Sequence, residues 1–345
     1  MSSNAHAGGC APTRRELPMI PALGSDQLAE SAVASVAARL RQDVRFDGLW
    51  WRKLAALACG YGPEWVKRYM PAPIAALIFL LVPPNRRGAM ANMVRIVDTT
   101  RRAEAALAAL RMFTEFAHCM AETMEYYGPS PRPIRVDLPQ RDRVVDALRE
   151  GRGVVVVTGH FGNWDIAAKS LHDHGRPINM VMSREGNGTT NPYVRAARER
   201  AGVHVIYSDT SVFSALNMIR ALRRNEVVAI QLDRSPATVG ARLVPFFGAP
   251  ASFPLGPFIL ARAAAAPLIP VFIPRLGTRH YAVRIGDRFS VPQDPPVLEN
   301  VMDEVVRFFE GTVRAYPTQW FQFAPFWPDD AATRHRAVEH VGVRA

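Results

Sequence analysis

The sequence predicts an α/β protein with a mostly parallel central sheet flanked by helices and a helical N-terminal layer. Three observations support this prediction. The 345-residue chain is 48% hydrophobic and 21% charged, a composition typical of globular proteins. Residues 46–127 show helical periodicity throughout, and from residue 150 short apolar runs alternate with amphipathic segments. Strands that alternate with helices are typical of a parallel sheet covered by helices on its faces.

The predicted domain covers residues 46–330, with a helical part at 46–127 and an α/β core at 150–330. The small, polar residues 1–45 are expected to form a loose tail that lacks the apolar core of a signal peptide. A second tail is expected at 331–345. In the core, strands are predicted at 153–158, 178–182, 203–207, 227–232, 268–273 and 281–285. Helices are predicted at 164–173, 192–201, 212–224, 254–265 and 298–315.

The composition also restricts the partners. A net charge of +11 favours anionic partners such as phospholipid surfaces, phosphorylated substrates and acidic carrier proteins. Nucleic acid is not expected, because no basic stripe interleaved with aromatic residues is present. Three widely spaced cysteines form neither a disulfide framework nor a zinc pattern, which indicates a reduced compartment.

The most apolar stretch is "APIAALIFLLV" at residues 72–82, which is too short to span a bilayer. Prolines lie inside and after it, and cationic residues flank it, namely Lys67, Arg68, Arg86 and Arg87. With Trp65 nearby, this pattern is typical of a segment that lies in the membrane interface. A buried core helix is the alternative interpretation.

The stretch "VVVVTGHFGNWDIAAKSL" at residues 154–171 carries the clearest chemical signal. Four consecutive valines predict a strand buried on both faces, and helical periodicity resumes at Ile166. His160 therefore lies on the strand-to-helix turn, with Asn163 as the expected N-cap and Asp165 in the first helical turn. Open α/β sheets bind their ligands at this end of the strands.

A histidine and a carboxylate at such a turn can perform general-base catalysis. A neutral imidazole can take a proton from an attacking hydroxyl group, and a carboxylate can orient the ring and stabilise the imidazolium. We therefore expect His160 to be the base and Asp165 to orient it, with no metal and no cofactor. Gly162 is expected to permit the sharp turn and to leave room for a substrate. The alternative is that His160 caps a helix and Asp165 only interacts with the helix dipole.

The stretch "GHFGNWD" resembles the first motif, H-x-x-x-x-D, of glycerolipid-type acyltransferases. The resemblance extends to the bacterial branch that contains the late lipid A acyltransferases and the phosphatidylinositol mannoside acyltransferases. Four further stretches resemble blocks of that branch in the same order: "MSREGNGTTNPYVRAARERAG", "NEVVAIQLDRSP", "VPFFGAPASFPLGPFILARAAAAPLIPVF" and "YPTQWFQFAPFWP". The resemblance covers residues 50–328, and five ordered blocks are more specific than a single short motif.

The resemblance implies the fold of glycerolipid acyltransferases and the transfer of a fatty acyl chain from a thioester to a hydroxyl group. The donor is expected to be an acyl-carrier protein or acyl-CoA, and the acceptor a membrane-associated lipid or glycolipid. The expected location is peripheral, on the cytoplasmic face of the inner membrane. In this family the histidine is the general base and the acid orients it, and these roles fall on His160 and Asp165.

Further site residues follow from the resemblance. Arg198 matches the arginine of the second block and is expected to bind the thioester oxyanion or a phosphate, the alternative being a solvent-facing arginine. Asp233 is expected to hold an acceptor hydroxyl or to pair with Arg198, the alternative being a loop carboxylate bonded to Arg234. Substrate contacts are also expected for Arg184, Asn191, Phe247 and Gly248.

Two other functions share the same residues. A thioesterase or other hydrolase would use the histidine and the acid to activate water, and a non-catalytic member would only bind lipid or carrier. No G-x-S-x-G turn is present, which argues against a serine hydrolase.

Overall fold

The computed structural model describes residues 57–166, 175–182, 198–199, 202–208, 212–234, 240–291 and 295–327. Statements about structure below concern these residues. The two predicted tails, most of the predicted helices 164–173 and 192–201, and the sites Arg184 and Asn191 lie outside them.

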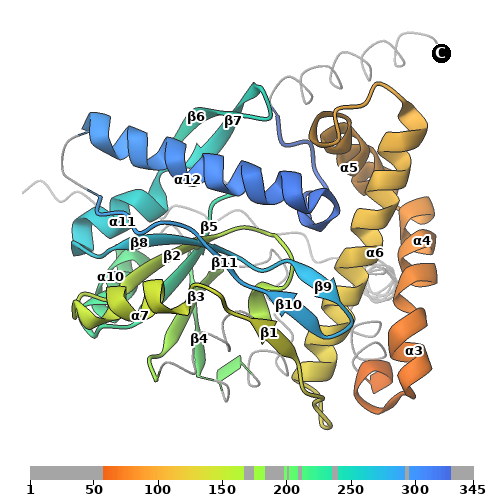
Figure 1. Cartoon of the computed structure of the whole chain (residues 1–345), viewed down its shortest axis with the longest axis horizontal. Helices are drawn as coiled ribbons and strands as arrows, with labels where there is room; N and C mark the ends of the chain where they lie inside the picture. Colours follow the sequence, from red (N-terminus) through yellow and green to blue (C-terminus); the bar gives the residue numbers. More distant parts are fainter. Residues whose placement is uncertain are drawn as a thin grey trace, which may run out of the picture. The chain divides into compact units, whose positions relative to one another are not determined.

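A six-stranded sheet with the order β11-β8-β2-β5-β3-β4 forms the centre of the fold (Figure 1). Its strands are β2 (Val154–Thr158), β3 (Ile178–Met182), β4 (Val203–Tyr207), β5 (Val227–Gln231), β8 (Leu268–Phe272) and β11 (Arg284–Ile285). The pairs β8–β2, β2–β5, β5–β3 and β3–β4 are parallel, whereas β11 pairs with β8 in antiparallel orientation. Every residue of β2 and β8 is buried, as the valine run predicted.

The predicted mostly parallel central sheet is confirmed only in part, because this sheet is mixed and two further sheets accompany it. A second sheet has the order β1-β10-β9, with β1 at Arg135–Asp137, β9 at Arg275–Gly277 and β10 at His280–Ala282. An antiparallel hairpin of β6 (Ala241–Phe246) and β7 (Ala249–Pro254) forms the third. The predicted strand 281–285 is thus two short strands in different sheets. Strands β1, β6, β7 and β9 were not predicted, because none of them is an uninterrupted apolar run of the kind that marks a buried strand.

Helices pack around the central sheet (Figure 1). They are α7 (Arg141–Arg149), α10 (Val212–Arg223), α11 (Gly256–Ala264) and α12 (Pro295–Ala315), followed by the short 3₁₀ helix η1 (Pro317–Gln319). The predictions for 212–224, 254–265 and 298–315 match α10, α11 and α12, whereas α7 was not predicted. Helix α12 buries a row of apolar residues, among them Met302, Val305 and Phe309, against β6 and β8.

The predicted helical N-terminal layer is confirmed for residues 57–126. It consists of helical residues at 57–61, then α3 (Glu64–Tyr69), α4 (Pro71–Leu81), α5 (Pro83–Ile96) and the 25-residue α6 (Arg102–Tyr126). Helices α4 and α5 pack on α6 (Figure 1). None of the described helices is both long and apolar enough to cross a membrane.

Candidate active site

The site forms where two neighbouring parallel strands end. Strands β2 and β5 pair in a register that places Thr158 opposite Gln231, the last residue of each strand. His160 and Asp233 each lie two residues beyond these ends. Because both strands end at the same edge of the sheet, the two residues meet there although 73 positions separate them in the sequence.

Asp233 binds His160 twice. Its Oδ1 atom lies 2.9 Å from Nδ1 of the imidazole, and its Oδ2 atom accepts a hydrogen bond from the His160 backbone N–H at 2.8 Å. The Asp233 side chain is 1% exposed and the His160 side chain 15% exposed. The acid is thus enclosed, while the ring keeps contact with solvent. The edge of the ring also packs against Trp164, with centroids 5.5 Å apart.

The protonation state of Asp233 determines what the imidazole can do. Burial by itself would raise the pKa of Asp233, but the charge of a protonated His160 and hydrogen bonds from His160 and Trp320 outweigh burial and hold the pKa below its ordinary value. The ionised carboxylate only accepts hydrogen bonds, so Nδ1 of the neutral ring must carry the proton. The other ring nitrogen, Nε2, is then free to accept a proton.

Asp165 has a different partner. Both of its oxygens accept hydrogen bonds from Arg198, at 2.6 Å from Nε and 2.9 Å from an Nη atom. Both side chains are nearly inaccessible, with exposures of 2% for Asp165 and 7% for Arg198. Burial would lower the pKa of Arg198, but the charge and hydrogen bonds of Asp165 outweigh burial and raise it. The second Nη atom of the guanidinium group contacts the Met182 thioether at 3.3 Å.

These contacts correct the expected partner of His160 and bear on two alternatives for Asp233 and Arg198. The carboxylate that orients His160 is Asp233 and not Asp165, because Asp165 directs both oxygens to Arg198. Asp233 pairs neither with Arg198 nor with Arg234. Arg198 is not a solvent-facing arginine, since it is buried in the ion pair.

The backbone of the turn is fixed by its neighbours. Gly162 has φ +56°, and a Cβ atom there would lie 1.7 Å from the carbonyl oxygen of Ile273. Glycine is thus required for close approach to the protein's own backbone, and not to leave room for a substrate as expected. The predicted N-cap is confirmed, because Asn163 Oδ1 accepts a hydrogen bond from Ile166 N at 3.4 Å.

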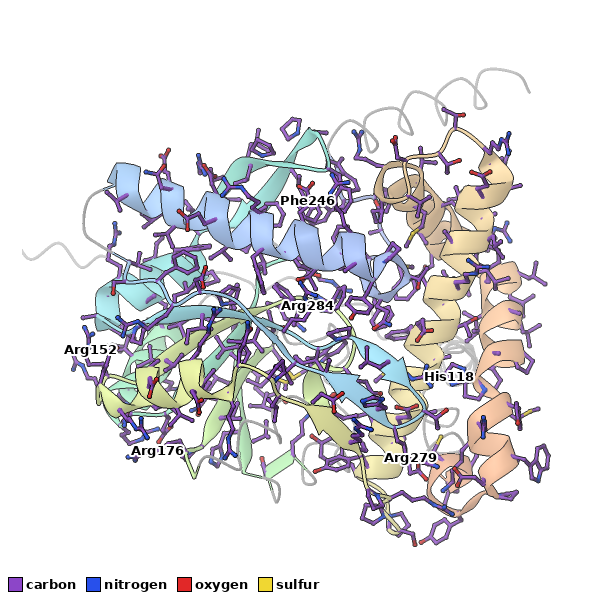
Figure 2. All side chains as sticks on the ribbon, viewed as in Figure 1. His118, Arg152, Arg176, Phe246, Arg279 and Arg284 are labelled. Atoms are coloured by element: carbon purple, nitrogen blue, oxygen red, sulfur yellow. The ribbon has the colours of Figure 1, made fainter. Side chains whose placement is uncertain are left out.

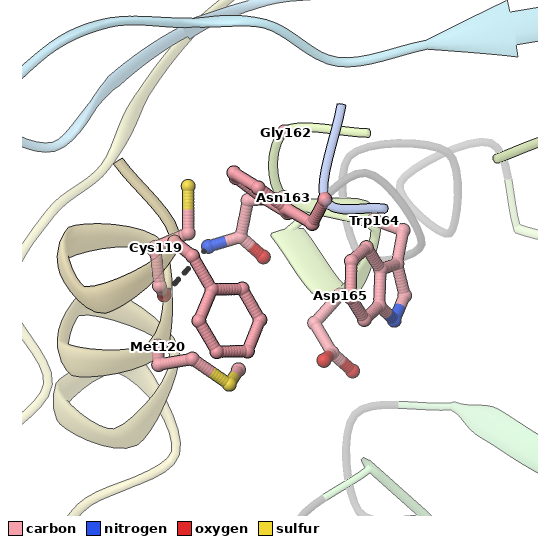
Figure 3. Close-up of a pocket in the computed structure, with 8 residues that line it drawn as sticks. Cys119, Met120, Gly162, Asn163, Trp164 and Asp165 are labelled. Carbon is pink, nitrogen blue, oxygen red and sulfur yellow. Dashed lines mark hydrogen bonds between the residues drawn. The ribbon is translucent and has the colours of Figure 1, made fainter. Parts of the chain in front are cut away.

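Asn163 also ties the turn to α6. Its amide group donates to the Cys119 carbonyl at 3.1 Å and to the Tyr281 hydroxyl at 3.2 Å, and its oxygen accepts from Thr123. Beside this contact, a small pocket lies between α6 and the turn (Figure 3). Its lining is mainly apolar: Phe116, Cys119, Met120, Gly162, Asn163, Trp164, Asp165 and Phe321. The lining side chains nearly fill it, and no space for a water-sized group remains in this conformation.

Phe247 and Gly248 form the turn of the β6–β7 hairpin, both with positive φ. The Phe247 ring is 7% exposed and lies under the Arg314 guanidinium, 4.6 Å away. Its neighbour Phe246, labelled in Figure 2, packs against Trp320 at 5.4 Å and so adjoins the dyad more closely. Substrate contact by Phe247 and Gly248 stays a prediction.

Sequence reasoning missed Trp320 and Tyr127. Trp320 donates from its indole nitrogen to Asp233 Oδ2 at 2.8 Å. Tyr127 ends α6 beside the Asp165–Arg198 pair, and burial, followed by the charge of Asp165, raises its pKa. In the sequence, the only indication for Trp320 is its position in the stretch "YPTQWFQFAPFWP", which resembles a block of the family.

Comparisons with known proteins identify the family of the chain. Residues 48–328 match the family model described as bacterial lipid A biosynthesis acyltransferase. The chain is 28% identical over 243 residues to a phosphatidylinositol mannoside acyltransferase of Mycobacterium tuberculosis, an alignment that covers 63% of this chain and 73% of that protein. It is 25% identical over 206 residues to the protein of the same name from Mycolicibacterium smegmatis, covering 59% of this chain and 66% of that protein. The chain belongs to the bacterial lipid A biosynthesis acyltransferase family and is an enzyme that transfers acyl groups.

Proposed function

We propose that the enzyme transfers a fatty acyl chain from a thioester to a hydroxyl group of a membrane lipid or glycolipid, with His160 as the general base. The observation that carries this proposal is the His160–Asp233 pair at the carboxyl end of β2 and β5. An ionised acid on Nδ1 leaves Nε2 as the proton acceptor, which is the arrangement that acyl transfer to an alcohol requires.

In the proposed reaction, Nε2 of His160 removes the proton of the acceptor hydroxyl while its oxygen attacks the thioester carbonyl. The tetrahedral intermediate collapses with cleavage of the C–S bond, and the thiolate takes the proton from the imidazolium ring. The products are an ester and a free thiol. Asp233 stabilises the imidazolium ring between the two proton transfers.

Arg198 supplies positive charge beside the turn. Asp165 binds its Nε atom and one Nη atom, so the fork is fixed. The second Nη atom contacts the Met182 thioether and is proposed to turn to an oxyanion or a phosphate oxygen when substrate binds. We assign Asp165 the role of positioning Arg198.

The pocket between α6 and the turn is proposed to hold the acyl carbons nearest the thioester. Its apolar side chains suit an alkyl chain, and it adjoins Asp165 and Trp164. In this conformation the lining side chains close it, so an acyl chain would enter only after they move.

The donor is proposed to be acyl-CoA or an acyl-carrier protein, both of which are anionic and match the net charge of +11. The acceptor is proposed to be a glycolipid, because the relatives above are named for phosphatidylinositol mannoside and the family for lipid A.

The test is incubation of the purified enzyme with an isotope-labelled acyl donor and a membrane lipid extract, followed by mass spectrometry. A gain of one acyl mass in one lipid class, absent with His160→Gln, supports the proposal. Release of free fatty acid without any acylated lipid would show a thioesterase instead. Parallel reactions with acyl-CoA and acyl-carrier protein identify the donor.

We also propose that the enzyme lies peripherally on the cytoplasmic face of the inner membrane through α3 and α4. Apolar side chains stand in solvent along these helices, including Trp65 at 58%, Leu77 at 49% and Leu80 at 64% exposure. Helix α4 is therefore not simply a core helix, since only residues such as Ala75 and Phe79 face the interior. Exposed apolar groups at this density are typical of a membrane contact.

The nearby cations are fewer than the sequence suggested. Lys67 forms an ion pair with Glu125 at 3.0 Å, and Arg86 donates to the carbonyl groups of Phe79 and Leu80. Arg68 and Arg87 are exposed and are proposed to meet anionic headgroups.

Sedimentation with phosphatidylglycerol vesicles tests this contact. The double variant Leu77→Asp/Leu80→Asp should lose most vesicle binding, and high salt should weaken binding of the parent protein. Leu216→Asp/Leu243→Asp is the matched control, because both residues are exposed leucines on other elements. If the folded α4 variant binds like the parent, α4 is not the contact.

A further inference from the structure

We infer that Trp320 is a positioning residue for the reaction: its indole N–H holds Oδ2 of Asp233 so that Oδ1 stays directed at Nδ1 of His160. The inference rests on the proposed role of the pair as a general base. No sequence pattern or comparison assigns this role to Trp320.

The geometry divides the carboxylate between two tasks. Oδ1 has the imidazole as its partner, whereas Oδ2 accepts one hydrogen bond from the indole and one from the His160 backbone, each at 2.8 Å. Two donors on Oδ2 fix the rotation of the carboxylate about its Cβ–Cγ bond. Among the described residues, His160 is the titratable group that faces Asp233.

The indole is itself held firmly. Trp320 is 0% exposed and packs edge-on against Phe246, Phe309 and Phe326. Its backbone segment pairs with the catalytic turn, since Phe321 N donates to the His160 carbonyl at 2.7 Å and Gly162 N donates to the Gln319 carbonyl at 2.9 Å. One short segment therefore positions both members of the dyad.

Loss of the indole N–H has a defined chemical consequence. A hydrogen bond to a charged group stabilises the ionised form, so its removal makes the Asp233 carboxylate more basic. A more basic carboxylate draws the Nδ1 proton more strongly and stabilises the imidazolium ring in the resting enzyme. The acid limb of the pH–rate profile should then move to higher pH.

The chain offers a matched control in the same aromatic cluster. Trp327 is 1% exposed, stacks on Phe246, and donates from its indole nitrogen to the Phe246 carbonyl at 3.1 Å. Trp327→Phe and Trp320→Phe each remove one buried indole hydrogen bond and keep an aromatic ring. Only Trp320 has Asp233 as its acceptor.

The test compares the pH dependence of acyl transfer in the two variants. Trp320→Phe should lower kcat roughly ten- to a hundredfold with little change in KM, and should move the acid limb up by roughly one pH unit. Trp327→Phe should keep the acid limb of the parent protein, even if this variant and Trp320→Phe unfold at similar denaturant concentrations. Equal kinetics in both variants, or a loss of rate with an unmoved limb, would overturn the inference.

A measurement on the substrate-free enzyme separates this inference from the proposed function. Of the indole N–H signals in the ¹⁵N NMR spectrum, one should move with pH in the folded parent protein, and the same signal should shift in Asp233→Asn and in His160→Gln. It should persist in Trp327→Phe. If no indole signal responds to Asp233→Asn, Trp320 does not position the acid, whatever the enzyme acylates. This spectrum needs no Trp320 variant to fold.

Discussion

Two buried aspartates flank the catalytic turn, and they differ in partner and in purpose. Asp165 lies five residues from His160 in sequence but forms a fork-to-fork ion pair with Arg198. Asp233 lies 73 residues away but contacts both the ring and the backbone of His160. The acid nearer in sequence binds a cation, and the distant acid binds the proposed base.

The difference shows how a parallel sheet assembles a site. Local spacing places Asp165 two residues after the Asn163 cap, which hydrogen bonds tie to α6. Register places Asp233 beside His160, because equal positions past two paired strand ends are neighbours. The motif identifies the base, whereas the strand order identifies its acid.

The largest expected effect separates the two acids by activity. Asp233→Asn should lower kcat/KM by about three orders of magnitude, because the wrong tautomer of His160 is favoured and the imidazolium loses its counter-charge. Asp165→Asn should lower it by only about tenfold, through a less ordered Arg198. Initial rates of acyl transfer by both folded variants measure this. A larger loss for Asp165→Asn would restore the assignment that the sequence suggested.

The loss of stability should be larger for Asp165→Asn than for Asp233→Asn, the reverse of the order expected for activity. Asp165→Asn leaves the buried Arg198 charge without its counter-ion and should cost about 3 kcal/mol of unfolding free energy. Asp233→Asn can rearrange its hydrogen bonds and should cost about 1 kcal/mol. The double variant Asp165→Asn/Arg198→Gln should recover part of the Asp165→Asn loss, as measured by urea unfolding. Strictly additive losses would contradict the buried pair.

The pocket beside Asp165 provides a smaller test. Met120→Trp enlarges a side chain that lines this pocket and should hinder its opening to an acyl chain, which shifts donor preference toward shorter acyl chains by roughly tenfold in the ratio of kcat/KM values. Leu107→Trp, at an exposed position on the same helix, is the control. An unchanged chain-length preference would show that the acyl chain does not bind in this pocket.

The smallest effect concerns pH and stability on α6. Burial, followed by the charge of Arg275, lowers the pKa of His118 to about 4 (labelled in Figure 2). The unfolded chain then binds more protons than the folded one between pH 6.5 and 4, so stability falls as pH falls through this window. His118→Gln should remove ~1 kcal/mol of this loss between pH 7 and 5, after allowance for partial exposure. If the parent protein and His118→Gln lose the same unfolding free energy between pH 7 and pH 5, the pKa of His118 is not lowered in the folded protein.

Much of the fold could be predicted from the sequence. The valine run and the apolar strands near 180, 205, 230 and 270 match the parallel strands within one residue, because buried strands have a strong apolar signal. His160 and the Asn163 cap followed from the same local reasoning. Strand order did not, since periodicity identifies a strand but not its neighbours. The partner of His160 was therefore assigned to the wrong acid.

Buried polar contacts were equally beyond local patterns. Glu122 lies on the buried face of α6 and bonds to Tyr281 and Arg275, which come from the distant second sheet. Lys67 pairs with Glu125 in the same way, so a cation expected at the membrane is occupied. Such pairs join residues from different elements, and only the packed structure brings them together.

A double-mutant cycle tests the central claim most directly, namely that Asp233 acts through His160 and Asp165 does not. The measurement is kcat/KM for Asp233→Asn and Asp165→Asn, each in the parent protein and in His160→Gln. We expect Asp233→Asn to lower kcat/KM hardly at all once His160 is replaced, whereas Asp165→Asn should lower it as much as in the parent protein. If Asp165→Asn becomes silent in His160→Gln and Asp233→Asn keeps its full effect, the dyad has been assigned to the wrong acid.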